Sequence, residues 1–352
     1  MTADVAFLAE ANQSIGTGHL VEALHLARAA EGSGLRSIVI VPRATPRRLL
    51  ESHPFPVWPI ESLDPQDLNR WAAQACASGV RAAVIDFRSV TNLQLTGLAA
   101  GGVKTYCIDE LGGRTLECEA VFNPTIMEDR HHYGPADSAR LFKGPSYFPL
   151  AAEYARYHRQ PRSFMGALGS VTISMGGVDR SGATLRVFAA LDAWPTNADR
   201  HVVLGGSFAW EQEFEELLST SRSRWQVHRN PSGLAELLAA SDVAITAGGN
   251  TLYELACVGT PAIVLHEDAH EGEQGSAFES RGFGRAIGSG VSFEAGKLRA
   301  ALMEFDNAEV REAHSLAGRA IVDGLGAARI CDIVVRDLAR SLMSEGLSHD
   351  AS

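Results

Sequence analysis

Short runs of β-branched and aliphatic residues alternate with longer amphipathic stretches along most of the chain. In its first half the short runs are VAFLA, SIVIV, AAVID and KTYCID, at residues 5–9, 37–41, 82–86 and 104–109. Apolar residues at helical spacing occupy 20–30 and 68–76 between them. Apolar runs separated by helices are typical of parallel strands buried on both faces. The first half therefore predicts a doubly wound α/β domain, with its loops gathered at the carboxyl ends of the strands.

The alternation stops in a stretch rich in proline and aromatic residues, 142–161, which suits a connector, and then restarts. A chain of 352 residues is long enough for two domains of about 150 residues each. We therefore expect an N-terminal Rossmann-like domain over 1–158, a second one over 159–325, and a C-terminal helix and tail over 326–352. Two such domains would face a central cleft.

Charge and composition exclude several kinds of partner. With 31 basic and 42 acidic residues, the formal net charge is -11, which argues against a broad surface for nucleic acid or anionic membrane. No apolar run reaches the roughly 20 residues that span a bilayer, and the N-terminus lacks the basic region of a signal peptide. The five cysteines are widely spaced and form no CxxC pair. They are expected to be reduced thiols of a cytoplasmic protein.

Three glycine-rich turns each follow a predicted strand and precede a predicted helix: SIGTGH (14–19), SMGGVDRSG (174–182) and TAGGNT (246–251). Such turns let backbone N–H groups and a helix N-terminus hold a phosphate without a basic patch. Tight strand-to-helix turns also need glycine for steric reasons alone. Neither GxxxxGK[ST] nor GxGxxG is present, so the usual signatures of nucleoside triphosphate hydrolysis and dinucleotide redox chemistry are missing.

The third turn carries more information than the other two. TAGGNT opens a helix that places Glu254 one turn inside, before a Gly-Thr-Pro turn into a buried strand. A carboxylate at that position can accept hydrogen bonds from the ribose hydroxyls of a ligand lying over the start of the helix. It can equally complement the helix dipole. The residues alone leave both interpretations open.

In this segment the chain resembles the nucleotide-binding signature of the MurG-like GT-B nucleotide-sugar enzymes. The likeness extends over roughly residues 5–330 and, in order and spacing, is similar to the SpsG-type family, which includes the UDP-sugar hydrolase of pseudaminic acid biosynthesis. The stretches that carry it are GTGHLVEALHLA, VID (84–86), CIDE (107–110), FNPT (122–125), GPSYFPLAAEY (144–154), ISMGGVD (173–179) and ITAGGNTLYELACVGTPAIVL (245–265).

The resemblance implies a role for each matching residue. His19 takes the place of the family's general base, with Asp86 as a second catalytic candidate, and Glu254 takes the place of the ribose ligand. The diphosphate would lie on backbone and helix-start residues: Gly176, Gly177, Gly248, Gly249, Asn250 and Thr251. The sugar or acceptor would meet a third set: Gly16, Gly18, Glu22, Arg88, Glu273 and Gln274. Neither a cofactor nor a metal ion is implied, and the expected ligands are a UDP-sugar or related nucleotide-sugar and a small-molecule acceptor.

Three positions depart from the family pattern. Glu22 stands where the family usually has arginine, Asp86-Phe87-Arg88 stands for a DHY-like triplet, and Glu273 replaces an asparagine. All three lie where the sugar or the attacking group is expected, so the nucleotide assignment transfers better than the reaction. Three functions remain open: an inverting nucleotide-sugar hydrolase, an inverting glycosyltransferase, and a non-catalytic nucleotide-sugar-binding protein.

Local physics gives competing interpretations of the candidate catalytic residues. A helix N-terminus disfavours an imidazolium, so the pKa of His19 is expected to be lowered and the ring to be neutral; otherwise His19 bonds only to its own turn. Asp86 ends a predicted strand, where it can orient His19, bind an acceptor or cap the next turn. The segment HEDAHEGEQ (266–274) is expected to be a solvated acidic loop facing the sugar, rather than a metal site.

Overall fold

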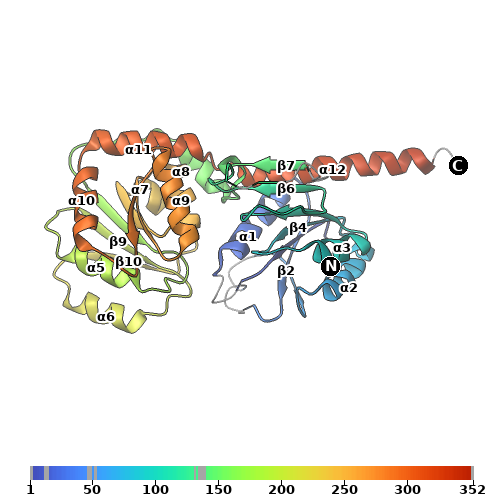
Figure 1. Ribbon diagram of the computed structural model, residues 1–352, viewed down its shortest axis with the longest axis horizontal. Coiled ribbons are helices and arrows are strands. Elements are labelled where there is room, and N and C mark those ends of the chain that lie inside the picture. The colour runs from blue at the N-terminus through green and yellow to red at the C-terminus, as the bar shows by residue number, and fades with distance from the viewer. Residues whose placement is uncertain are drawn as a thin grey trace. The chain divides into compact units, whose positions relative to one another are not determined.

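The computed structural model describes residues 3–11, 16–45, 50, 54–130, 132–133 and 140–349, with backbone alone over 342–349. The chain forms two compact units. Unit 1 comprises residues 1–152 together with 325–352, and unit 2 comprises residues 153–324. Unit 2 is thus continuous in sequence, whereas unit 1 is completed by the C-terminal end of the chain (Figure 1).

Unit 1 is built on a parallel sheet of seven strands in the order β3-β2-β1-β4-β5-β6-β7. The strands are β1 (Val5–Ala9), β2 (Ser37–Pro42), β3 (Val57–Ile60), β4 (Ala82–Asp86), β5 (Lys104–Ile108), β6 (Ala120–Asn123) and β7 (Arg140–Lys143). The helices are α1 (Gly18–Gly32), α2 (Pro65–Ala77), α3 (Asn92–Ala100), the short 3₁₀ helix η2 (Pro145–Tyr147) and α12 (Gly326–His349).

Alternate residues of the central strand β1 belong to two different apolar cores. Phe7 lies in a core formed with α1 and α12, which contributes Ile330 and Val334. Leu8 lies in the opposite core, formed with α2 and α3. Because a side chain changes face at every residue of a strand, a sheet covered on both sides requires the continuous apolar runs found in the sequence.

Unit 2 is built on a parallel sheet of six strands in the order β10-β9-β8-β11-β12-β13. The strands are β8 (Ser170–Ser174), β9 (Asp199–Leu204), β10 (Trp225–Arg229), β11 (Val243–Thr246), β12 (Ala262–His266) and β13 (Arg285–Ser289). The helices are α4 (Ala152–His158), α5 (Ala183–Asp192), α6 (Glu211–Thr220), α7 (Ala235–Ala240), α8 (Asn250–Val258), α9 (Ala269–Ser280), α10 (Ala295–Phe305) and α11 (Ala308–Ile321).

Both sheets confirm the predicted doubly wound α/β architecture. In each sheet the chain starts at an inner strand, β1 or β8, builds outward on one side, and then returns to build on the other, through β4 or β11. The two strands at which the winding reverses are paired directly in both sheets. Parallel α/β sheets bind ligands beyond the carboxyl ends of the strands at such a reversal point.

The structure differs from the expectations at three places. The sequence analysis places the first domain boundary near residue 158, whereas the compact units divide between Ala152 and Glu153. The stretch expected to be a connector includes part of β7, the helix η2 and the helix α4. The segment 266–274 is not a loop: His266 ends β12, and α9 begins at Ala269, where the Asp268 side chain accepts the N–H of Glu271.

The C-terminal helix is held to unit 1 by polar contacts as well as by its apolar face. Asp337 of α12 accepts a hydrogen bond of 3.1 Å from the hydroxyl of Tyr106 on β5 and forms an ion pair with Arg140 of β7. Both Tyr106 and Asp337 are buried. The apolar face of this helix completes the core of unit 1.

In the described residues, no helix is both long and apolar enough to cross a membrane. All five cysteines are free thiols, as expected.

Replacing Asp337 by alanine should destabilise unit 1, because the Tyr106 hydroxyl would be buried without its acceptor. We expect a loss of about 1–3 kcal/mol in the free energy of unfolding, measured by urea denaturation. Adding Tyr106→Phe to Asp337→Ala should cost less than the sum of the two single changes, since the orphaned hydroxyl is removed. An Asp337→Ala variant as stable as the parent would contradict this account.

Candidate functional site

The imidazole of His19 and the carboxylate of Asp86 meet at the carboxyl edge of the first sheet. Asp86 is the last residue of β4, and His19 is the second residue of α1, which follows β1. His19 Nδ1 lies 2.7 Å from Asp86 Oδ1. Since β1 and β4 are the strands at which the winding reverses, the pair lies where parallel sheets bind ligands.

The burial of this pair gives the contact its strength. The His19 side chain is 12% exposed and that of Asp86 only 2%. The second carboxylate oxygen, Asp86 Oδ2, is buried without a hydrogen-bond partner among the described residues. An ionised carboxylate only accepts hydrogen bonds, so His19 Nδ1 donates and Nε2 is the nitrogen left to exchange a proton.

The expectation of a lowered His19 pKa is wrong. Burial on its own lowers the pKa, but the charge and hydrogen bond of Asp86, with the charges of Glu110 and Glu22, outweigh burial and raise the pKa of His19 to about 10. The ring is therefore an imidazolium at neutral pH in the unliganded protein. Of the three interpretations open for Asp86, the structure shows the contact with His19: Asp86 bonds to the ring and raises its pKa.

The other residues expected around His19 occupy different environments. Gly16 has a positive φ of +83° and open space where a Cβ would stand, and Gly18 is the first residue of α1. Glu22 lies three residues beyond His19 on α1 and is buried. Arg88 is exposed, and its backbone N–H donates to the Glu10 carboxylate at 2.6 Å. Residues 12–15, which include part of the SIGTGH turn, lie outside the described residues.

Glu110 is a neighbour of His19 that the sequence analysis did not single out. It follows the strand β5, which pairs with β4, and its charge acts on the His19 ring. The signal was present in the CIDE stretch, because a carboxylate just past a central parallel strand points to the same edge as Asp86.

In unit 2, the turn before α8 provides no side-chain cap for that helix. The residue preceding the helix is Gly249, which has no side chain with which to cap it. Gly248 packs against the helix α9 so closely that an added Cβ would come within 2.2 Å of the Glu271 carbonyl oxygen. Asn250 and Thr251 form the first turn of α8. A helix start whose preceding residue provides no side-chain cap, together with the helix dipole, favours a negatively charged group at this point.

The glycine turn before α5 is different, because the protein fills that helix end itself. The Asp179 carboxylate accepts the backbone N–H of Ala183 at 2.8 Å and that of Thr184 at 2.9 Å. Burial raises the pKa of Asp179, although these hydrogen bonds oppose the shift. Gly176 and Gly177 precede this capped helix, with the Gly177 carbonyl accepting the N–H of Ser207. The sequence analysis did not single out Asp179, the carboxylate that caps this helix.

Glu254 lies in the first turns of α8, as predicted. The residue is half-buried, yet its carboxyl group is withdrawn from water, and this desolvation raises the pKa of Glu254 to about 7 despite hydrogen bonding with Tyr154 and Thr251. The buried Tyr154 comes from the helix α4. A carboxyl group with this pKa changes its charge near neutral pH.

The predicted pair Glu273 and Gln274 separates on the helix α9. Glu273 is exposed, whereas Gln274 is buried. The Gln274 amide oxygen accepts the Tyr253 hydroxyl at 2.8 Å, and its nitrogen donates to the Gly248 carbonyl. The amide is thus engaged on both sides in the turn before α8. The described residues contain no group of three or more His, Cys, Asp or Glu side chains arranged to hold a metal ion.

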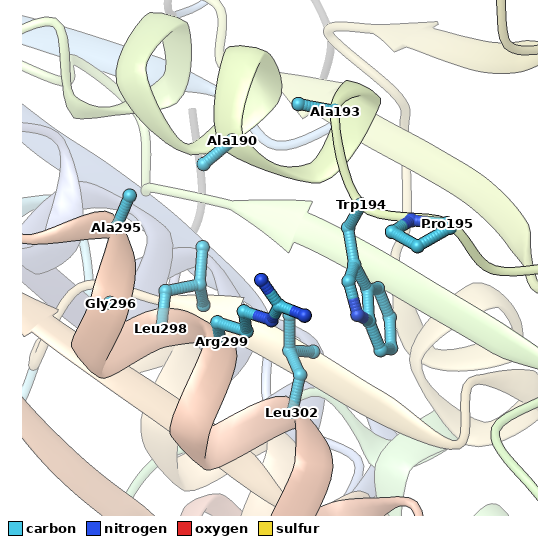
Figure 2. A pocket seen from close by; sticks show the side chains of 9 residues that line it. All are labelled: Ala190, Ala193, Trp194, Pro195, Ala295, Gly296, Leu298, Arg299 and Leu302. Atoms are coloured by element: carbon cyan, nitrogen blue, oxygen red, sulfur yellow. The ribbon is translucent and has the colours of Figure 1, made fainter.

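A separate hollow of about 310 Å³ lies on unit 2 between the C-terminal end of α5 and the start of α10. Figure 2 shows the Trp194 ring and the Arg299 side chain beside each other among small and aliphatic residues. None of the predicted site residues lines it. Helices that follow parallel strands end at the opposite edge of the sheet from the ligand loops, so the C-terminal end of α5 is away from the candidate nucleotide site.

Comparison with known proteins identifies the fold. No protein-family model matches the chain. The chain is 24% identical to the spore coat polysaccharide biosynthesis protein SpsG of Bacillus subtilis over 234 residues, which cover 66% of this chain and 69% of that protein. It is 27% identical over 146 residues to the uncharacterized protein MJ1062 of Methanocaldococcus jannaschii, covering 40% of this chain and 30% of that protein.

Solved structures match over nearly the whole chain at low sequence identity. MurG of Acinetobacter baumannii superposes with a TM-score of 0.67 at 13% identity, covering 95% of this chain and 99% of that one. The calicheamicin glycosyltransferase CalG4 gives a TM-score of 0.67 at 12% identity, covering 97% and 99%. The two doubly wound domains therefore adopt the GT-B fold of these structures.

Replacing Asp86 by asparagine should lower the pKa of His19 by several units from about 10, because the charge and charge-assisted hydrogen bond that oppose burial are removed. The pKa can be read from the His19 ring resonances in an NMR titration. Glu110→Gln should lower it less, and an unchanged pKa in Asp86→Asn would contradict the assignment.

The same shift predicts a pH-dependent stability. The folded pKa lies above the ordinary value of 6.5, so protonation of His19 stabilises the fold fully below about pH 6.5 and this contribution is lost as the pH approaches 10. The stability difference between the parent and His19→Gln should shrink over that interval, as followed by urea denaturation at several pH values. A difference that stays constant would contradict it.

Proposed function

We propose that this protein is a nucleotide-sugar enzyme, with a UDP-sugar as the favoured substrate. Unit 2 binds the nucleotide and unit 1 supplies the base. The observation that carries the catalytic half is the 2.7 Å contact between His19 and the buried Asp86 at the reversal point of the first sheet. The similarity to SpsG, named a polysaccharide biosynthesis protein, and the GT-B fold support the substrate class.

The diphosphate is assigned to the start of α8. There Gly249, Asn250 and Thr251 form a helix start whose preceding residue provides no side-chain cap, whereas at the start of α5 the Asp179 carboxylate accepts two backbone N–H groups. Gly176 and Gly177 stand beside this position, since they follow β8 and β8 pairs with β11. Helix-end amides neutralise the charge that the leaving diphosphate gains, a role taken by metal ions in other enzymes.

Glu254 is assigned to the ribose. Its position on α8, shortly after the diphosphate turn, suits a carboxylate that accepts the hydroxyl protons of the nucleotide. For this role Glu254 must be ionised, and with its pKa near 7 it is only partly so at neutral pH.

The favoured reaction is hydrolysis with inversion. His19 Nε2 takes a proton from a water molecule whose oxygen attacks the anomeric carbon. The bond from that carbon to the diphosphate oxygen breaks, and the electron pair leaves with the nucleotide diphosphate. Asp86 stabilises the imidazolium that forms, and general-base assistance of this kind contributes a factor of about 10² to 10⁴. Because His19 is protonated at neutral pH before substrate binds, the rate should rise with pH.

The alternative is glycosyl transfer, in which His19 deprotonates an acceptor hydroxyl or amine instead of water. Two observations support glycosyl transfer. Some similar structures are named as glycosyltransferases, and Glu22, which departs from the hydrolase pattern, is buried on the same helix as His19. Gly16, Gly18, Arg88 and Glu273 are proposed to border the sugar or acceptor.

Purified protein incubated with a panel of UDP-sugars should release UDP. Release without an acceptor supports hydrolysis, and release that strictly requires an added acceptor supports transfer. Binding without release under any condition would support a non-catalytic binding protein. His19→Ala should keep nucleotide affinity but lose a factor of about 10² or more in turnover, and near-parental turnover would exclude the proposed base.

UDP affinity should fall as the pH drops below about 7, because protonated Glu254 no longer accepts from the ribose. Isothermal titration calorimetry between pH 6 and 8 measures this trend. Glu254→Gln should bind more weakly at pH 8 and lose most of the pH dependence. If Glu254→Gln retains the parental affinity and trend, Glu254 does not contact the ribose.

A further inference from the structure

Gln274 stands at the most constrained point of the candidate nucleotide site. Its side chain is 5% exposed and that of its partner Tyr253 only 1%. The Tyr253 hydroxyl donates to Gln274 Oε1 at 2.8 Å, and Gln274 Nε2 donates to the carbonyl oxygen of Gly248. The resemblance implied a sugar or phosphate ligand here, but both ends of the amide serve the protein itself.

The contacts tie three segments together. Tyr253 belongs to α8 and Gln274 to α9, and Gly248 lies in the turn between β11 and α8. Tyr253 also packs edge-on against Phe278, with ring centroids 5.0 Å apart, so its own position is fixed. A buried amide with both polar ends satisfied resists reorientation, because turning toward a ligand would leave a buried hydroxyl and a carbonyl unpaired.

The turn that contains Gly248, the partner of Gln274, packs tightly against α9. An added Cβ at Gly248 would come within 2.2 Å of the Glu271 carbonyl oxygen, so the backbone of the turn touches the backbone of α9 directly. The next residue, Gly249, immediately precedes α8. The direction of the first α8 amides therefore depends on where the Gly248 carbonyl is held.

We propose that Gln274 is a positioning residue rather than a substrate ligand: oriented by Tyr253, it fixes the Gly248 carbonyl and thereby aims the first amides of α8 at the diphosphate. This deepens the proposed function and rests on it for the identity of the anion. Backbone donors stabilise a developing charge only when they are preorganised. Without the Gln274 amide the turn would have to be ordered at each binding event.

The two roles of Gln274 predict different patterns. If Gln274 is a positioning residue, its substitution lowers the affinity for UDP itself and raises KM more than it lowers kcat. Removing the hydroxyl of Tyr253, which is too buried to meet a ligand, has the same effect. If Gln274 instead bound the sugar, its substitution would lower the affinity for a UDP-sugar but not for UDP, and Tyr253→Phe would have no effect.

The test compares Gln274→Met, which keeps the length of the side chain but not its hydrogen bonds, with Tyr253→Phe, the double variant, and Ser276→Ala as an exposed control on α9. UDP affinity measured by calorimetry should fall about 10-fold in Gln274→Met, as expected if the lost hydrogen bond to the Gly248 carbonyl contributes roughly 1.4 kcal/mol to binding. Tyr253→Phe should weaken binding in the same direction, the double variant should resemble Gln274→Met, and Ser276→Ala should match the parent.

Hydrogen exchange supplies a readout without ligand. Amides of residues 247–252 should exchange faster in Gln274→Met and Tyr253→Phe than in the parent or Ser276→Ala. Exchange elsewhere in the chain and the melting temperature should stay unchanged. Unchanged exchange in both variants, or a loss confined to UDP-sugar affinity with Tyr253→Phe silent, would overturn the proposal. If the parent binds no UDP, the proposed function fails, while the exchange data still decide whether Gln274 holds the turn.

Discussion

The reversal of winding in a parallel sheet is the constraint on which the candidate site depends. In the first sheet, the helix that follows β1 covers one face and the helix that follows β4 covers the other. The two loops must therefore part at the carboxyl edge, where such sheets bind ligands. Unit 1 puts an imidazole and a carboxylate at this point, and unit 2 puts a helix start whose preceding residue provides no side-chain cap at the equivalent one. The two sheets thus offer different chemistry from the same topological position.

Magnitudes explain why His19 is charged although it begins a helix. A helix N-terminus disfavours a cation by about 0.3–1 kcal/mol, and by up to about 2 kcal/mol when the cation is partly buried. A carboxylate in direct contact shifts a pKa by about 1–3 units, each unit being 1.36 kcal/mol. Asp86 is nearly excluded from water and lies at hydrogen-bond distance, and two further carboxylates add to its effect. The effect of the carboxylates on the His19 pKa therefore exceeds that of the helix dipole. His19 must lose its proton before it can act as a base.

Much of the fold could be predicted because its signals are local. The runs at 5–9 and 82–86 are strands with the predicted bounds, since strands buried on both faces must be continuously apolar. The short strand β7 and the helix α9 were missed. The exposed β7 lacks an apolar run, and α9 reads as a loop because its first turns are acidic and contain Gly272. Its helical form comes from the Asp268 cap and from packing on the β11 turn, which depends on the tertiary structure.

The candidate site divides in the same way. His19, Asp86 and the α8 turn were predictable because each lies at the end of a recognisable strand or the start of the helix that follows. What could not be predicted is which polar groups the protein uses on itself. Asp179 caps α5 and Gln274 holds the Gly248 carbonyl, and both depend on distances across turns that no sequence spacing reveals.

The route of the chain has a consequence for how the protein is made. The core of unit 1 includes Ile330, Cys331 and Val334 of α12, which pack with residues of β1 and α1. During synthesis the first strands leave the ribosome early, but the helix that closes their core emerges only after all of unit 2. Unit 2, which is uninterrupted in sequence, can fold as soon as it emerges, whereas unit 1 must wait with part of its apolar surface uncovered. The segment made first is then among the last to be finished, and it is the part of the nascent chain most in need of protection from aggregation.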